Sequence, residues 1–289
     1  GYWLQSRGER TTILDGGNAV DHWNYEMARH ALTGTDNQKA LDFLYAHNAT
    51  HFLIDSTDIG KYRAFGIIGS DENGDRKTAI SILKREPSQT KELKNSVFDF
   101  YTGGAWLDED LVYDLNGTRI FLPAEKSFLV GISLKTNPDS GEIIEQPQGI
   151  FIYQPNQNSQ VQQYTLPLRY GFDSELRDFG SGVGIGLYVM PEVFEAKPNL
   201  RMDEKGVLIV LSERSVKSQL VRLYIYEEEN PYFKLVHSED EIFITELKSS
   251  IKGFDSDLLL YNGMVRGPIK IWEINYPQNI ELKEEYLNI

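Results

Sequence analysis

The spacing of hydrophobic residues changes along the chain, and this change constrains the fold more than any other feature. Over about the first hundred residues, segments in which apolar residues recur at intervals of three and four predominate, whereas from Trp106 onward apolar and polar residues alternate in short stretches. The first spacing is typical of amphipathic helices and the second of half-buried strands. The sequence therefore predicts an α+β fold, with a helix-rich N-terminal core unit followed by a β-rich region of antiparallel strands.

The first part of the chain predicts two helices, a strand and a third helix. One helix is expected within residues 21–34 and a second within residues 35–48, each beginning at capping residues and ending at Gly34 or Asn48. The short apolar run 51–54 is typical of a buried strand, and it leads directly to Asp55.

Eight later stretches carry the patterns expected of strands, and turn-forming pairs such as Asn137-Pro138 separate them. In one of them, Val221, Leu223 and Ile225 would share one face of a strand. The eight stretches are residues 118–122, 126–134, 149–153, 162–168, 207–211, 221–226, 241–246 and 269–274.

The composition excludes several classes of function. The 289 residues include 43 acidic and 29 basic ones, which gives a formal net charge of -14 and argues against nucleic acid as a partner. There are no cysteines, so disulfides, thiolate zinc sites and cysteine nucleophiles are excluded. The apolar runs fall far short of the roughly 20 residues that a spanning helix needs. An initial Gly1 in place of methionine leads us to expect that the natural protein extends upstream.

One local pattern carries the candidate chemistry, and it follows the predicted strand 51–54. If Asp58 opens a helix, Lys61 lies one turn later on the same face, and Phe65 and Ile68 continue that stripe. On spacing alone, the simpler interpretation is a helix-capping aspartate followed by an exposed lysine and a buried apolar face.

The pattern stands in an ordered series of segments. Gly1-Tyr2-Trp3 comes first, a segment Arg-Thr-Thr-Ile-Leu-Asp follows at residues 10–15, and Asp58 and Lys61 come after the predicted helices and strand. This order resembles the catalytic subunit of archaeal and eukaryotic oligosaccharyltransferases. In that family a Trp-Trp-Asp-Tyr-Gly signature opens the soluble C-terminal domain, and an Asp-x-x-Lys motif follows.

The likeness covers roughly residues 1–70 and 221–276. Gly1 fits the last position of the signature, and Phe65 stands where the family usually has Met or Ile, so the motif departs from the usual type there. With this extent we expect a core domain of residues 1–105 and 206–276. A β-rich insertion or peripheral domain would span residues 106–205, and a tail residues 277–289.

The resemblance implies a division of labour within a glycosyltransferase of GT-C type. Such enzymes transfer an oligosaccharide from a dolichyl phosphate or pyrophosphate carrier to the asparagine of Asn-x-Ser/Thr in an acceptor polypeptide. Mn²⁺ or Mg²⁺ and the lipid-linked oligosaccharide are bound by the membrane half, and the soluble domain lies on the extracytoplasmic face of the cell membrane. This chain would then contain no catalytic residue and no metal ligand, and it would be inactive by itself.

For this chain the resemblance implies an acceptor-binding pocket formed by Asp58, Lys61, Phe65, Ile68 and Gly1. Selecting a hydroxyl requires directed hydrogen bonds, and Phe65 or Ile68 offers an apolar contact to the methyl group of threonine. The alternative function is a carbohydrate-binding or surface-layer β-rich module without transferase activity, which the 12% aromatic content and the many predicted strands favour.

Other features have plainer interpretations. His47 and His51 have the spacing of a metal pair, but no further ligand accompanies them in the sequence. The alternating glycines of residues 180–186 indicate a bulge or close backbone packing, and the acidic run 108–110 indicates a solvated loop, with calcium a minor alternative. Two glycosylation sequons begin at Asn48 and Asn116, of which Asn116, in a predicted turn, is the more accessible.

Overall fold

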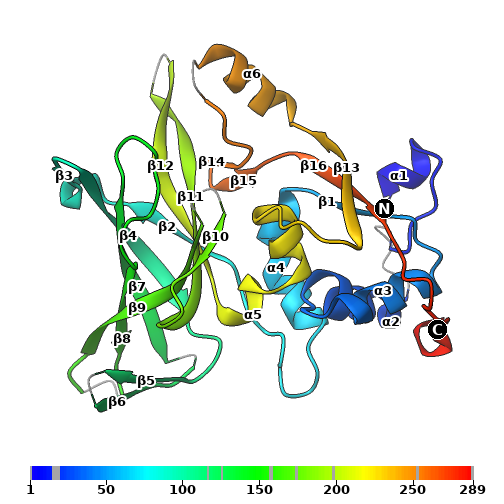
Figure 1. Cartoon of the computed structure of the whole chain (residues 1–289), viewed down its shortest axis with the longest axis horizontal. Helices are drawn as coiled ribbons and strands as arrows, with labels where there is room; N and C mark the ends of the chain where they lie inside the picture. Colours follow the sequence, from blue (N-terminus) through cyan, green and yellow to red (C-terminus); the bar gives the residue numbers. More distant parts are fainter. Residues whose placement is uncertain are drawn as a thin grey trace. The chain divides into compact units, whose positions relative to one another are not determined.

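The computed structural model describes residues 2–14, 20–115, 117–124, 126–155, 159–172, 175–196, 199–251 and 254–287, with the backbone alone for residues 2 and 3 (Figure 1). Strands account for 41% of the chain and helices for 24%, and most strand pairs are antiparallel, so the prediction of a mixed α+β fold is confirmed at this level. The chain forms two compact units. The first unit comprises Gly1–Thr78, Lys217–Leu247 and Gly267–Ile289, and the second comprises Ala79–Val216 and Lys248–Arg266.

The amino-terminal part of the first unit contains α1 (Tyr2–Ser6), α2 (Asp21–Glu26), the π-helix η1 (Met27–Leu32), α3 (Asn37–Ala46) and α4 (Thr57–Ile68). The two helices predicted within residues 21–48 and the helix predicted after Asp55 are confirmed, with the first divided into α2 and η1, whereas α1 was not predicted. The carboxylate of Asp36 accepts a hydrogen bond from the backbone N–H of Gln38 at 2.8 Å, which caps α3. Leu41, Phe43 and Leu44 of α3 are fully buried, so this helix is the centre of the unit's core.

A three-stranded antiparallel sheet completes the first unit. It consists of β1 (His51–Ile54), β13 (Phe233–Glu239) and β16 (Ile269–Ile274), in the order β1-β16-β13. Ile54 lies opposite Lys270, and Lys270 lies opposite Ser238. The strands predicted at residues 51–54 and 269–274 are thereby confirmed, and the turn from β1 into α4 takes only two residues.

Two of the predicted strands are wrong, because both segments are helical. Residues 221–225 form the π-helix η3 (Val221–Ile225), in which Leu223 of one supposed strand face and Tyr224 of the other are both buried. Residues 242–246 lie in α6 (Ile242–Ser250), in which Ile244 and Leu247 are buried three residues apart. Burial of residues from both supposed faces of η3 removes most of the difference on which the strand assignment depended.

The second unit is built on one large, mostly antiparallel sheet. Its strands are β2 (Ser81–Arg85), β3 (Lys91–Leu93), β4 (Ser96–Trp106), β7 (Ser127–Thr136), β8 (Gln148–Tyr153), β9 (Gln162–Phe172), β10 (Leu176–Asp178), β11 (Val183–Ala196), β12 (Asn199–Leu211), β14 (Leu259–Tyr261) and β15 (Met264–Arg266). The order β9-β8-β7-β4-β2-β12-β11 closes into a ring, because β11 also pairs with β9 in parallel. Closure removes two sheet edges and encloses an apolar core.

The interior of this ring is filled by alternate strand residues. Leu83, Leu129, Phe151, Leu166 and Leu208 belong to its core and are fully buried. The strands predicted within residues 126–168 and at residues 207–211 are therefore confirmed, and a register irregularity between Val183 and Gly186 confirms the bulge expected from the glycines.

Shorter elements complete the chain. A separate hairpin pairs β5 (Leu111–Leu115) with β6 (Thr118–Leu122), and Gly117 in its turn has a φ of +83°, a value that favours glycine. The remaining helices are η2 (Pro87–Gln89), α5 (Glu213–Val216) and η4 (Glu284–Leu287).

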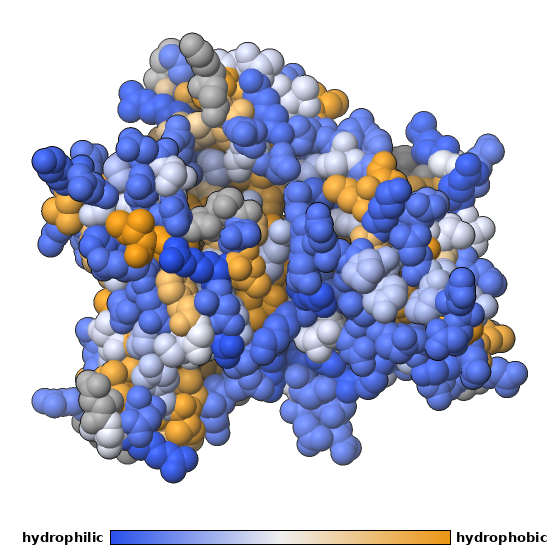
Figure 2. Space-filling view, viewed as in Figure 1, coloured by the Kyte–Doolittle hydropathy of each residue, from blue (hydrophilic) through white to orange (hydrophobic). Residues whose placement is uncertain are grey.

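Hydrophilic residues cover most of the face shown in Figure 2, with hydrophobic ones scattered between them. Among the described helices, none has the length and apolar character needed to cross a bilayer. The second unit begins at Ala79, whereas the composition change in the sequence suggested a boundary near residue 105.

Candidate functional site

The first turn of α4 brings Asp58 and Lys61 together, as their spacing suggests. The Nζ of Lys61 lies 3.1 Å from Oδ1 of Asp58 and 2.8 Å from Oγ1 of Thr57. The side chain of Asp58 is 18% exposed and that of Lys61 is 54% exposed, so the ammonium faces solvent while the carboxylate lies deeper.

Asp58 also helps to fix the start of the helix, together with Asp55. Oδ1 of Asp55 accepts a hydrogen bond from the backbone N–H of Thr57 at 2.8 Å, and Oδ2 of Asp58 accepts one from the backbone N–H of Asp55 at 3.2 Å. This reciprocal arrangement resembles a capping box. Asp58 thus lies in the first turn of α4 and not at its N-cap, which is Ser56, and its other carboxylate oxygen is held beside Lys61.

Burial shapes the electrostatics of this turn. Burial raises the pKa of Asp58, and the neighbouring charge of Asp55 adds to this rise, while the N–H of Asp55 and the Lys61 ammonium oppose it. Burial also raises the pKa of Tyr224, with further contributions from Asp55 and Asp58. The carboxyl group of Asp58 is therefore a stronger proton acceptor than a solvated aspartate.

The face of α4 that carries Lys61 continues with two apolar residues. Phe65 is half-buried and Ile68 is 46% exposed. Gly60, the residue before Lys61, has no side chain, and no heavy atom lies within 4 Å of the position that a Cβ there would occupy. The structure thus places Asp58, Lys61, Phe65 and Ile68 on one helix, whereas Gly1 lies outside the described residues.

The start of α4 is anchored by residues that the sequence analysis did not identify. The Oγ of Ser56 donates to Oε1 of Glu241 at 3.1 Å, a contact that spans 185 residues of sequence. Lys270 is buried, lies 5.0 Å from the ring centroid of Tyr224 and pairs with Glu227. No local pattern joins these residues, so only the paired strands β1, β16 and β13 could reveal them.

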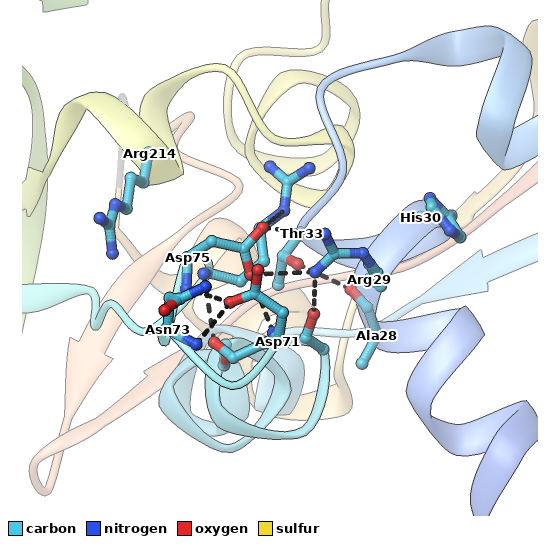
Figure 3. Close-up of polar contacts among 12 residues, drawn as sticks. Ala28, Arg29, His30, Thr33, Asp71, Asn73, Asp75 and Arg214 are labelled. Atoms are coloured by element: carbon cyan, nitrogen blue, oxygen red, sulfur yellow. Dashed lines mark hydrogen bonds and ion pairs between the residues drawn. The ribbon is translucent and has the colours of Figure 1, made fainter.

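The opposite end of α4 is held by an arginine. Arg29 donates two hydrogen bonds to the carboxylate of Asp75 at 2.9 Å each and a third to the carbonyl of Gly69 at 2.8 Å (Figure 3). A Cβ on Gly69 would lie 2.7 Å from the backbone nitrogen of Arg29, so this close approach requires glycine. Both ends of α4 are therefore tied to other elements of the first unit.

The two histidines with metal-ligand spacing lie in different surroundings. His47 packs edge-on against Trp23 and Phe43, with ring centroids 4.6 and 4.8 Å away, and burial lowers its pKa. Nδ1 of His51 lies 2.9 Å from Oγ1 of Thr50 and faces solvent. Within the part of the chain that the structure describes, no group of three or more His, Asp or Glu residues is arranged to hold a metal ion.

The acidic run 108–110 belongs to the second unit and follows β4. Glu109 pairs with Arg214 at 2.8 Å, and Oδ1 of Asp110 accepts from the backbone N–H of Ala124 at 2.8 Å. Together with Trp106, these acidic residues line a cavity of about 110 Å³. Trp106 is 61% exposed, and its ring centroid lies 3.7 Å from that of Phe128.

Of the two sequon asparagines, Asn48 lies within the described residues. Asn48 follows α3, is exposed and has a φ of 53°, which is a left-handed backbone conformation. Asn116 lies outside the described residues.

Comparison of the chain with protein families, with curated proteins and with solved structures finds no match.

Proposed function

We propose that the first unit recognises the acceptor sequon Asn-x-Ser/Thr in an oligosaccharyltransferase of GT-C type. The observation that supports this proposal is the exposed Lys61 ammonium, held by the partly buried carboxylate of Asp58 beside exposed apolar residues of the same helix. An ammonium has three donors, and Thr57 and Asp58 accept two of them, which leaves one for a ligand.

A serine or threonine hydroxyl complements this arrangement. Its oxygen accepts the remaining donor of Lys61, and its hydrogen is offered to the carboxylate of Asp58, whose pKa is raised. The methyl group of threonine is then placed against Phe65 or Ile68. A peptide with alanine at this position leaves the Lys61 donor without a partner, which is the physical basis for its rejection.

The proposal assigns binding, not bond formation, to this chain. The helix-rich amino-terminal unit faces the acceptor, while Mn²⁺ or Mg²⁺ and the lipid-linked oligosaccharide are held by the membrane half of the enzyme on its extracytoplasmic side. We expect no transfer by the chain alone when it is supplied with metal and lipid-linked sugar, so it serves as the negative control in the following assay.

The test is the substitution Lys61→Ala in an enzyme that contains both halves. We expect transfer to a sequon peptide at limiting concentration to fall roughly ten- to hundredfold, since a hydrogen bond to a charged group contributes about 1.5–3 kcal/mol. Arg63→Ala is the matched control, because Arg63 is exposed two residues further along the same helix and faces another direction. Undiminished transfer by the Lys61 variant would contradict the assignment of Lys61 to the acceptor-binding site.

A second candidate function is carbohydrate binding without transferase activity, and it concerns the second unit. The observation in its favour is Trp106, which lies exposed at a cavity that is also lined by carboxylates. A sugar ring can stack on an indole face while its hydroxyl groups donate to acidic side chains.

Titration calorimetry with soluble oligosaccharides tests this second function. We expect Trp106→Ala to weaken binding about tenfold, whereas Phe121→Ala, which removes another exposed aromatic ring on β6, leaves binding unchanged. Equal affinities for the Trp106 variant and the unmodified chain exclude this cavity as the sugar site.

A further inference from the structure

Strand β13 forms an open edge of the first unit's sheet. The sheet order is β1-β16-β13, and among the described residues no strand pairs with the outer side of β13. Every residue of β13 after Phe233 is exposed, on both faces of the strand. Leu235 and Val236 are 42% and 47% exposed. An edge of this kind presents backbone N–H and C=O groups that are available to another extended chain.

The register places one end of this edge level with the candidate site. Ser238 lies opposite Lys270, which lies opposite Ile54, so the carboxyl ends of β13 and β1 lie at the same end of the sheet, on either side of β16. The residues that follow each strand meet, because Glu241 after β13 accepts a hydrogen bond from Ser56 before α4. A strand added to β13 would lie about 14 Å from β1, at roughly 4.8 Å per strand, which about four extended residues can cross.

A cavity lies at the other end of the edge. It has a volume of about 600 Å³, and its walls include Leu235, Trp272 and the run of three glutamates at residues 227–229. Glu227 pairs with Lys270 and Glu228 with Arg222, and Lys234 also lines the cavity, so Glu229 is the one of the three carboxylates that has no ion pair in the described part of the chain. The apolar walls suit an apolar side chain, and Glu229 offers a contact to a basic one.

A second copy of this chain is a poor occupant of the edge. Each copy has a formal net charge of -14, so two copies repel one another. Lys234 and the irregular register between Leu235 and His237 further oppose the pairing of two identical strands. An uncharged or basic polypeptide has neither disadvantage.

We propose that the acceptor polypeptide docks on β13 as an additional strand, with the flank of its Asn-x-Ser/Thr triplet paired to this edge and the triplet passing on toward Lys61. The inference rests on the proposed function and deepens it. Backbone pairing provides affinity without reading side chains, so acceptors with many different flanking sequences can be bound. The cavity at residues 227–229 adds a preference for a basic or apolar side chain in the flank.

The first test uses N-methylated peptides, which leave the protein unchanged. Two sequon peptides carry N-methyl groups on alternate flanking residues, one set on odd positions and the other on even positions, with the triplet unmodified. Because a strand turns successive N–H groups to opposite edges, we expect one set to weaken binding to this chain about tenfold and the other to have little effect. Equal affinities for both peptides overturn the docking mode.

Hydrogen exchange separates this inference from the proposed function. Unmethylated peptide should slow exchange of the β13 amides, and a peptide with alanine in place of the Ser/Thr residue should still do so at higher concentration. Slowed exchange with the alanine peptide, together with full activity of the Lys61→Ala enzyme, would support docking while the sequon assignment fails. The β13 amides could instead be protected without peptide, with a protection that rises with protein concentration. Together with a dimer in sedimentation, this result would show that a second copy of the chain occupies the edge, and it would overturn the proposal.

A charge reversal tests the contribution of the cavity. We expect Glu229→Lys to weaken binding of a peptide with a basic flank roughly three- to tenfold and to leave an uncharged peptide unaffected. Glu92→Lys on β3 changes the net charge by the same amount at an exposed site of the second unit and is the control. Identical losses in both variants would show a general charge effect and remove the cavity from the proposal.

Discussion

Arg29 connects three parts of the first unit through one guanidinium group (Figure 3). It lies in the π-helix η1, contacts the carbonyl of Gly69 after α4, and pairs with Asp75 in the turn beyond. The hydrogen bonds from Arg29 are the largest cause that lowers the pKa of Asp75 to about 2. Both side chains are partly exposed, so salt weakens their interaction.

This pair predicts a pH dependence of stability with a definite sign. The folded chain keeps Asp75 ionised where the unfolded chain, with a pKa of ~3.9, takes up a proton. The pair therefore stabilises the fold above about pH 4, and this contribution is lost as the pH falls toward 2. In Arg29→Ala we expect a lower free energy of unfolding at pH 6 and a smaller rise of this free energy between pH 3 and pH 6.

Urea unfolding at low ionic strength measures both quantities. Arg63→Ala removes an exposed arginine on α4 and should alter neither. An unchanged slope between pH 3 and pH 6 in Arg29→Ala would show that Asp75 is not the titrating group.

At the residue scale, local patterns identify half of the candidate site. The pairing of Asp58 with Lys61 and the stripe toward Ile68 follow from helical spacing, because both depend on residues within one helix. Ser56, Glu241 and Lys270 could not be found in this way. Their contacts depend on strand pairing between segments that are far apart in the sequence.

At the scale of elements, helices with one buried face and strands with one buried face were predicted well. Helix α4, buried at Ile59, Tyr62 and Gly66, and strand β1 are examples. The π-helix η3 was missed because four of its five residues are buried, and its sequence alternates in the manner of a strand. Helix α6 was missed because it is short and its most exposed residue, Ile242, is apolar and 80% exposed.

The two π-helices belong to another class of feature that the sequence pattern does not reveal. Each adds a residue to a helical turn, which shifts side chains relative to an α-helix. In η1 this geometry accompanies the contact of Arg29 with the end of α4, and in η3 it accompanies the hydrogen bond from Tyr224 to the carbonyl of Pro268 at 2.6 Å. Such positions depend on the packing of neighbours and not on local propensity.

At the scale of the whole molecule, each unit has its own buried core. Leu44 of the first unit and Leu83 of the second are both fully buried, and the ring of strands encloses its core residues within the second unit alone. We therefore expect two transitions in calorimetry. Leu44→Ala should lower one transition and Leu83→Ala the other, each by a loss of about 2–5 kcal/mol in the stability of its own unit.

Exposed substitutions in the same elements are the controls. Lys39→Ala on α3 and Lys84→Ala on β2 should move neither transition appreciably. A single transition that both leucine variants lower equally would mean that the two cores unfold as one cooperative block.

The closure of the strands into a ring in the second unit could not be predicted from the sequence pattern. Alternation shows that a segment is a strand and which face is apolar, but not which strand is its neighbour. The parallel pairing of β11 with β9 closes the ring, and it joins segments whose patterns contain no sign of one another.

The position of β16 governs the order in which the first unit can be assembled. β16 is the middle strand of its sheet, yet its last residue is Ile274, and both β1 and β13 bond to it instead of to one another. During synthesis from the amino end, β1 therefore has no strand partner until β16 has left the ribosome. The buried side of β1 stays exposed over that interval, which makes this segment open to unwanted pairing before the sheet forms.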